Sequence, residues 1–162
     1  MAIALAGAVW SAQLRGMDPV NLAEYEEVAR GKLAREAYDY YAGGANDGIT
    51  LRANVEAYGK LPLYHRVLRD VAARDTSVEV LGERISFPVM VAPTAFHRLA
   101  CAHGECATAR AAARAGTIMV MSTLSNTVIE EVAAAADGPK WFQLYIYKDR
   151  GATMDLVRRA EE

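Results

Sequence analysis

The chain has 162 residues, of which 52% are hydrophobic, and its charges nearly balance at a formal net charge of −2. This profile is typical of one soluble globular domain and excludes a largely disordered chain. Arginine and glutamate are interspersed rather than gathered in blocks, so nothing indicates nucleic acid or an anionic membrane as a partner. We therefore expect a small-molecule ligand.

The cysteines and the first residues bear on the compartment. Cys101 and Cys106 are too few for a disulfide scaffold, so the expected location is the reducing cytoplasm. The opening stretch MAIALAGAVWSA is apolar, which leaves a signal peptide as one interpretation. No basic residue precedes it, however, and it is too short to span a bilayer. We interpret residues 1–16 as an N-terminal extension and residues 17–162 as part of one domain that starts at Met17.

Two short helices are expected first, within residues 21–44. Asn21 is a candidate N-cap, because Glu24 follows it at the spacing of a capping box. Gly31 should separate the two helices, and the glycine pair at 43–44 should end the second one.

Residues 45–86 predict little regular structure. A polar loop through Thr50 and Asn54 is followed by a stretch with few periodic features to about residue 74. Residues 77–86, SVEVLGERIS, then alternate around a Leu-Gly-Glu-Arg turn, which predicts a small peripheral hairpin.

From residue 87 onward, short apolar runs suited to buried parallel strands alternate with helical segments. The expected order is strand 87–92, helix 104–115, strand 117–121, helix 127–136, strand 140–146 and helix 149–162. This order indicates right-handed βαβ units, in either a doubly wound sheet or a (β/α)8 barrel. The loop after the first strand has no G-x-G-x-x-G turn, which argues against a dinucleotide site.

Polar groups follow each of the three expected strands. In both architectures ligands bind at the carboxyl ends of parallel strands. The residues there are Pro-Thr-Ala at 93–95, Ser-Thr-Leu-Ser at 122–125 and Gln-Leu-Tyr at 143–145. Any one of them alone would suit a loop cap or a buried amide paired to the backbone. Together, their hydroxyl, carboxamide and N–H groups favour a site for a planar heteroaromatic ring.

Five segments resemble, in order and spacing, successive blocks of the family of FMN-dependent α-hydroxy-acid oxidases and dehydrogenases, which includes glycolate oxidase, lactate oxidase and mandelate dehydrogenase. They are YDYYAGGAND at 38–47, VAPTA at 91–95, GECATARAA at 104–112, GTIMVMST at 116–123 and WFQLYIYKDR at 141–150. The resemblance runs from about Asn21 to the last residue. It implies an α/β fold, with N-terminal helices and about three βα units forming the N-terminal part of a TIM (β/α)8 barrel.

The resemblance also implies a cofactor, FMN, and residues that bind it. Pro93, Thr94 and Ala95 would lie against the isoalloxazine ring, with backbone N–H groups near its reactive N5 edge. Ser122 and Gln143 would hydrogen-bond the pyrimidine side of the ring.

Two tyrosines are implied to contact the substrate. Tyr40 would reach the carboxylate, and Tyr145, which we also assign to catalysis, would face the substrate's own oxygens. A tyrosine hydroxyl suits both tasks, because it donates a hydrogen bond while its ring keeps the pocket dry. The alternative for Tyr40 is simple packing, the role expected of Tyr38 and Tyr41.

Two further positions invite an interpretation. A cluster of histidines and cysteines lies within residues 97–106, but it lacks the recurring short spacings of a zinc site, so no metal is expected. Leu124 stands where glycolate oxidase carries a tryptophan over the substrate. The smaller side chain would leave room for an aromatic or branched 2-hydroxy acid.

The family's barrel has eight strands and three are expected here, so we expect the chain to be its N-terminal part. The family's lysine near the flavin, histidine base, arginine and phosphate-binding loops would fall in the remainder. None of His65, His97 and His103 matches the catalytic histidine, so no general base is assigned.

The expected function is FMN-dependent oxidation of an L-2-hydroxy acid to the 2-oxo acid, with oxygen or another electron acceptor, in a full-length protein that forms a homo-oligomer. The chain by itself is expected to be inactive. The alternative is a non-catalytic remnant, or a half-barrel that needs a complementary chain, because three parallel strands leave an open apolar edge.

Overall fold

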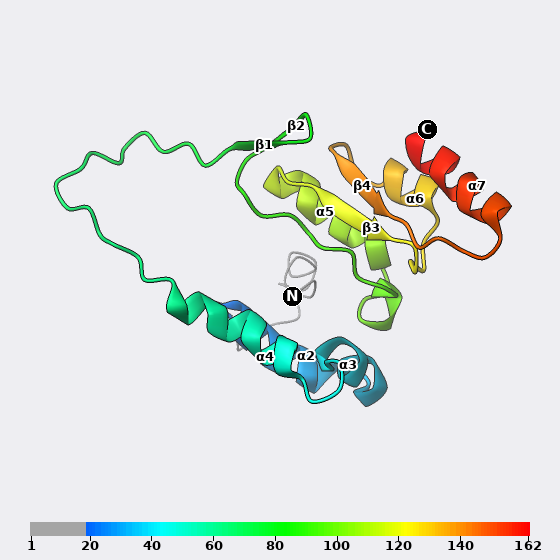
Figure 1. The fold of residues 1–162 in the computed structure, drawn as a ribbon, viewed down its shortest axis with the longest axis horizontal. Coiled ribbons are helices and arrows are strands. Elements are labelled where there is room, and N and C mark those ends of the chain that lie inside the picture. Colours follow the sequence, from blue (N-terminus) through cyan, green and yellow to red (C-terminus); the bar gives the residue numbers. More distant parts are fainter. Residues whose placement is uncertain (1–18) are drawn as a thin grey trace. The chain divides into compact units, whose positions relative to one another are not determined.

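The computed structural model describes residues 19–162, so the expected N-terminal extension, residues 1–16, lies outside the described range. The chain divides into two compact units. One comprises the residues up to Leu33 together with Thr76–Glu162, and the other comprises Ala34–Asp75. Figure 1 gives the order of the elements. Across residues 19–162, no helix is both long and apolar enough to cross a membrane.

The first helix described, α2 (Leu22–Lys32), begins at the predicted cap. The Asn21 side chain accepts a hydrogen bond from the Glu24 N–H at 3.0 Å, and the Glu24 carboxylate accepts one from the Val20 N–H at 2.8 Å. The predicted break at Gly31 is wrong, because this glycine lies inside the helix. An exposed glycine costs a helix only about 0.5–1 kcal/mol, and the chain leaves the helix instead at Leu33, where the backbone becomes extended.

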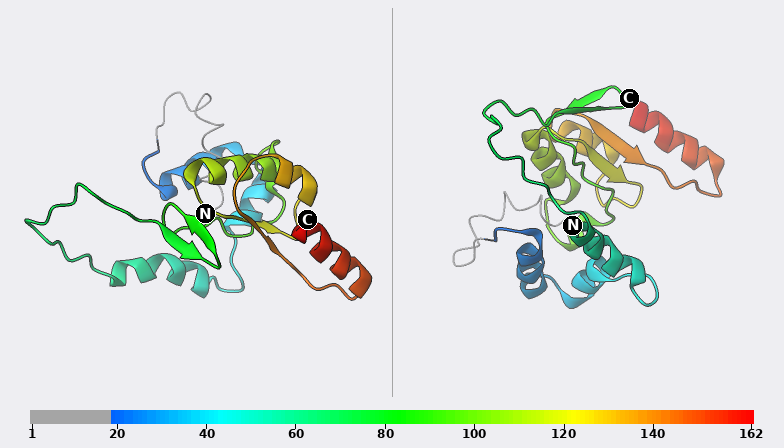
Figure 2. Two further views of the ribbon diagram at one scale, coloured as in Figure 1. Left: turned by 90° about the horizontal axis from the view of Figure 1, so that it is seen from above. Right: turned by 60° about the vertical axis from the view of Figure 1, so that its left-hand side comes forward.

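The unit Ala34–Asp75 contains α3 (Arg35–Ala42), α4 (Ile49–Glu56) and the 3-10 turn η2 (Ala57–Lys60). As predicted, α3 ends at Gly43, whose N–H binds the Asp39 carbonyl. The polar loop predicted through residues 50 and 54 is wrong, because α4 occupies it. The apolar residues of α4 do not gather on one face, and none of its residues is buried. No apolar stripe therefore marks this segment as a helix. Residues 61–75 form the long loop visible in Figure 2.

The predicted hairpin is confirmed as β1 (Val78–Val80) paired antiparallel with β2 (Glu83–Ile85). Leu81 and Gly82 form its turn with φ values of 50° and 85°. Two positive φ values are what a two-residue turn needs to match the twist of its strands. Beyond the hairpin, the Ser86 N–H donates to the Gly116 carbonyl at 2.8 Å, which attaches it to the βα units.

The alternation of strands and helices is also confirmed. Its elements are α5 (Gly104–Ala115), β3 (Met119–Ser122), α6 (Ile129–Ala134), β4 (Lys140–Gln143) and α7 (Arg150–Glu161). Strands β3 and β4 pair in parallel, from Met119 opposite Lys140 to Ser122 opposite Gln143. The strand predicted at 87–92 reduces to one parallel bridge between Val91 and Met119. Pro88 within this segment has no N–H to donate to a neighbouring strand. Among the described residues, the segment also pairs on one side only.

Consecutive helices pack against one another along the sheet. Helix α5 contacts β3 and α6, and α6 contacts α7, as Figures 1 and 2 show. Arg159 of α7 binds both carboxylate oxygens of Glu130 of α6, at 2.7 and 2.9 Å. These hydrogen bonds lower the pKa of Glu130 to about 2. Parallel strands in sequence order with neighbouring crossover helices are consistent with part of a (β/α)8 barrel, although the described strands do not close one.

The core lies between α5, α6 and the sheet. Its fully buried apolar residues are Val91, Ala109, Ala112, Met119, Met121 and Val132. The alanines on the inner face of α5 allow that helix to approach β3 closely, while the two methionines fill the remaining space.

Gly116 ends α5 in the left-handed conformation, at φ 68°, and a Cβ there would overlap the Ser86 Oγ. Replacing Gly116 with alanine should therefore lower the free energy of unfolding by at least about 1–2 kcal/mol, the cost of the left-handed backbone alone. Urea denaturation checks this. Gly31→Ala is the control, since nothing lies within 4 Å of its Cβ position, and it should stabilise α2. Equal effects of the two variants would contradict the prediction.

Candidate functional site at the carboxyl ends of the strands

Three of the segments singled out in the sequence meet at one edge of the sheet. Ser122 and Gln143 end β3 and β4 directly opposite one another. The loop after Val91 joins them, because the Phe96 N–H donates to the Leu124 carbonyl at 3.0 Å. The structure thus brings residues 93–95, Ser122 and Gln143 together, as their positions after parallel strands predicted.

Ser122 and Gln143 are linked through their side chains. The Ser122 hydroxyl is buried, donates to the Gln143 Oε1 at 3.4 Å and accepts from the Leu124 N–H at 3.1 Å. The amide nitrogen of Gln143 has no hydrogen-bond partner among residues 19–162. Two N–H donors therefore remain for a ligand at a half-buried position.

Thr123 fixes the chain as it leaves β4, a role the sequence did not reveal. Its N–H donates to the Gln143 carbonyl at 3.0 Å, and its hydroxyl donates to the same oxygen at 2.5 Å. The hydroxyl also accepts from the Tyr145 N–H at 2.8 Å. Tyr145 is thereby held beside the site through its backbone, and its side chain is 53% exposed.

Tyr40 belongs to the other unit, on α3. Its ring packs edge-on against Tyr41, with centroids 5.3 Å apart and planes at 72°. Half of its surface is exposed, whereas Tyr38 and Tyr41 are partly buried. A role for Tyr40 toward a substrate stays a prediction.

A buried carboxylate that sequence reasoning missed lies behind these loops. Glu105, in the first turn of α5, is completely buried. Its Oε1 accepts from the backbone N–H groups of His97 at 3.3 Å and Asn126 at 3.0 Å, and its Oε2 accepts from the Thr127 hydroxyl at 2.6 Å. Burial works to raise its pKa, but these hydrogen bonds outweigh burial and leave the pKa below its ordinary value. One signal was available, since Glu105 is the single acidic residue of an alanine-rich helix.

His97 lies in the turn η3 (His97–Leu99) and is also buried. Its Nδ1 lies 3.1 Å from the Thr108 hydroxyl. Burial lowers the pKa of His97 below its ordinary value, against the opposing effects of the Glu105 charge and a hydrogen bond to the Thr94 backbone. The imidazole is therefore neutral at pH 7, and it contributes a hydrogen bond to Thr108 rather than a positive charge.

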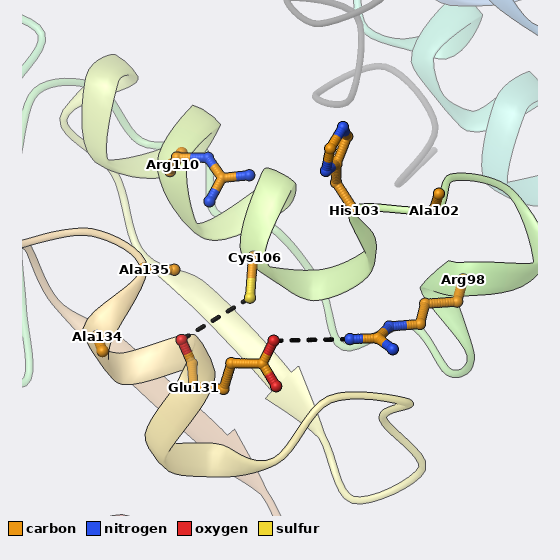
Figure 3. Close-up of a pocket in the computed structure, with 8 residues that line it drawn as sticks. All are labelled: Arg98, Ala102, His103, Cys106, Arg110, Glu131, Ala134 and Ala135. Atoms are coloured by element: carbon orange, nitrogen blue, oxygen red, sulfur yellow. Dashed lines mark hydrogen bonds and ion pairs between the residues drawn. The ribbon is translucent and has the colours of Figure 1, made fainter.

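A separate cavity of about 390 Å³ lies between α5 and α6 (Figure 3). Basic side chains from Arg98, His103 and Arg110 line it, with Cys106 and Glu131. Burial and the Glu131 charge raise the pKa of the Cys106 thiol, so it is not a reactive thiolate. No predicted FMN contact lines this cavity. Within residues 19–162, no three His, Cys, Asp or Glu side chains group closely enough to hold a metal ion.

The fold and the site define a class: an α/β protein with polar, uncharged groups at the carboxyl ends of parallel strands, suited to a planar ligand. The sequence profile of the family described as FMN-dependent dehydrogenase matches residues 29–162. The chain belongs to this family, whose cofactor is FMN.

Individual relatives agree with this assignment. Glycolate oxidase 3 of Arabidopsis thaliana is 48% identical over 146 residues, which are 90% of this chain and 40% of that protein. A crystal structure of mandelate oxidase with (S)-4-hydroxymandelic acid is 42% identical, with a TM-score of 0.83, covering 88% of this chain and 40% of the other. A mandelate oxidase variant with a C4a-OH-FMN adduct is 41% identical, with a TM-score of 0.79 and coverage of 84% and 41%. The chain thus spans about 40% of the length of these relatives.

The residues at the strand ends fit the pyrimidine side of a flavin. That side offers two carbonyl oxygens, which accept hydrogen bonds, and one N–H, which donates. The Gln143 amide has donors to spare, and the buried Ser125 hydroxyl also has no partner among the described residues. A buried polar group without a partner is costly, so a ligand that supplies one would stabilise this edge.

Proposed function

We propose that this chain forms part of the FMN site and part of the substrate pocket of an enzyme that oxidises an L-2-hydroxy acid to the 2-oxo acid. One observation carries the proposal: Ser122 and Gln143 are paired at adjacent strand ends, and no residue in the described part of the chain accepts from the Gln143 amide, in a chain of the FMN-dependent dehydrogenase family. The glycolate and mandelate oxidases among its relatives support a 2-hydroxy acid as substrate class.

Each residue has a proposed task. Ser122 and Gln143 would bind the pyrimidine side of FMN, and Pro93, Thr94 and Ala95 would hold the ring from the neighbouring loop. FMN supplies the two-electron acceptor chemistry, while the protein binds, orients and excludes water. The hydroxyl of Ser122 is already oriented by the Leu124 N–H, so little ordering is needed on binding.

The substrate side is proposed to include both tyrosines. Tyr145 would donate a hydrogen bond to the substrate's oxygens, and Tyr40 would bind its carboxylate. Leu124 is 37% exposed beside Ser122, and its modest size favours an aromatic or branched 2-hydroxy acid. Turnover would need a proton-accepting group and a carboxylate clamp beyond these residues, so we propose that oxidation requires a more complete barrel.

FMN binding by the chain tests the proposal. Titration into FMN, followed by flavin fluorescence, should give saturable binding. Gln143→Leu should weaken it about tenfold, because one hydrogen bond to a buried carbonyl is worth on the order of 1 kcal/mol or more. Asn54→Leu is the matched control, since it removes an exposed carboxamide on α4 and should change nothing. No saturable binding by the unmodified chain, or binding by Gln143→Leu as tight as that of the control, would contradict the proposal.

A further inference from the structure

The two loops that carry the proposed FMN contacts are joined by buried hydrogen bonds to one carboxylate. The loop after Val91 and the loop after β3 meet at the carboxylate of Glu105, which belongs to neither. Its Oε1 accepts the N–H of His97 from the first loop and the N–H of Asn126 from the second. A single oxygen atom therefore fixes the separation of two segments that lie 29 residues apart in sequence.

Two further contacts reinforce this link. The Arg98 N–H donates to the Asn126 Oδ1 at 3.2 Å, and the Thr127 hydroxyl donates to the second oxygen of Glu105 at 2.6 Å. Among the residues that the structure describes, Glu105 forms no salt bridge, and its hydrogen bonds come from two backbone N–H groups and a hydroxyl. Burying an ionised carboxylate is expensive unless such donors satisfy it, so each donor is held firmly in place.

The link lies within a few residues of the proposed flavin contacts on both sides. In the first loop, His97 follows Thr94 and Ala95 closely in the sequence. In the second loop, Asn126 and Thr127 follow Ser122, and Leu124 between them accepts the Phe96 N–H. Moving Asn126 away from His97 would therefore change the distance between Thr94 and Ser122.

We propose that Glu105 is a positioning residue, which locks the two loops together and so sets the width of the edge at which FMN binds. This inference rests on the proposed function. Glu105 is completely buried and would act through the backbone of His97 and Asn126. Its carboxylate geometry rather than its negative charge is what the site needs.

Substitutions can separate geometry from charge. In Glu105→Gln, the amide oxygen can still accept from both N–H groups, and the amide nitrogen can donate to the Thr127 hydroxyl, which rotates to accept. Glu105→Ala removes the link, and Thr127→Val removes only its hydroxyl arm. Val132→Ala is the control for general destabilisation, because it opens a cavity in the core without touching either loop.

The first arm of the experiment needs no cofactor. In ¹H–¹⁵N NMR spectra of the chain, Glu105→Ala should shift the amide signals of Thr94, Ala95, Leu124 and Ser125 and leave those of α7 in place. Thr127→Val should shift the same signals less, and Glu105→Gln least. If Glu105→Ala folds and the amide signals of the two loops stay in place, the proposed positioning role of Glu105 is wrong. Should Glu105→Ala not fold, the order of Thr127→Val and Glu105→Gln decides the question.

The second arm measures FMN affinity by flavin fluorescence. Glu105→Ala should weaken binding by about tenfold or more, Glu105→Gln by less than about threefold, and Val132→Ala hardly at all once each is confirmed folded. A loss in Glu105→Gln equal to that in Glu105→Ala would overturn the geometric role. If the unmodified chain binds no FMN, the proposed function fails, whereas the NMR arm still reports on the lock.

Discussion

Replacing Met119 with alanine should lower the free energy of unfolding by about 2–5 kcal/mol, the usual range for truncating a large buried side chain. Met119 is 1% exposed and lies in the middle strand, bridged to Val91 on one side and paired with Lys140 on the other. Helix α5 packs against β3. The backbones of the neighbouring strands and of α5 surround the Met119 side chain, so the space that it leaves cannot collapse easily. The remaining cavity then adds to the free energy lost with the buried apolar surface.

Met154→Ala gives the matched control, since the same atoms are removed from a side chain that is 56% exposed on α7. Its effect should stay within about 0.5 kcal/mol. Urea denaturation followed by far-ultraviolet circular dichroism measures both, with equal slopes required for the comparison. Similar losses for the two variants would mean that β3 is not the centre of the core.

The sequence predicted best where periodicity and a turn residue agreed. The helix 104–115, predicted from its alanine- and arginine-rich sequence, has the predicted bounds. The glycine at 116 in fact adopts the left-handed conformation that ends helices. Where the apolar pattern was weak, the prediction failed: α4 buries nothing, and so only its local backbone propensity could have revealed it.

Strand 87–92 failed for another reason. Its composition is that of a buried strand, yet Val89 is 54% exposed and only Val91 pairs, because a strand's burial depends on which segments flank it. Sequence alone could place residues 93–95, Ser122 and Gln143 at one edge, since parallel strands align their ends. It could single out Glu105 only as the one acidic residue of its helix, and it could not show what Glu105 and Thr123 bind, because the positions of their partners are determined only by the fold.

Acidification should destabilise the fold in two stages. The pKa of His97 is lowered by burial, so between its ordinary value of 6.5 and its folded value the unfolded state binds more protons. Stability is then complete above pH 6.5 and falls as the pH drops below it. Although burial opposes it, the net pKa of Glu105 is also lowered, so a second loss begins below its ordinary value of 4.5. Both groups therefore act in the same direction.

Free energies of unfolding measured by urea denaturation from pH 7.5 to pH 3.5 test this. His97→Asn, which cannot titrate but can still hydrogen-bond Thr108, should flatten the curve just below pH 6.5. Glu105→Gln should flatten it below pH 4.5. Glu130 also has a lowered pKa, about 2, but it is exposed, so added salt should weaken its contribution and leave that of Glu105 nearly unchanged. A His97→Asn variant that loses stability as steeply as the unmodified chain just below pH 6.5 would show that burial does not lower the pKa of the imidazole. In that case the pKa of His97 would be the same in the folded and unfolded states, and the loss of stability on acidification would come from other groups.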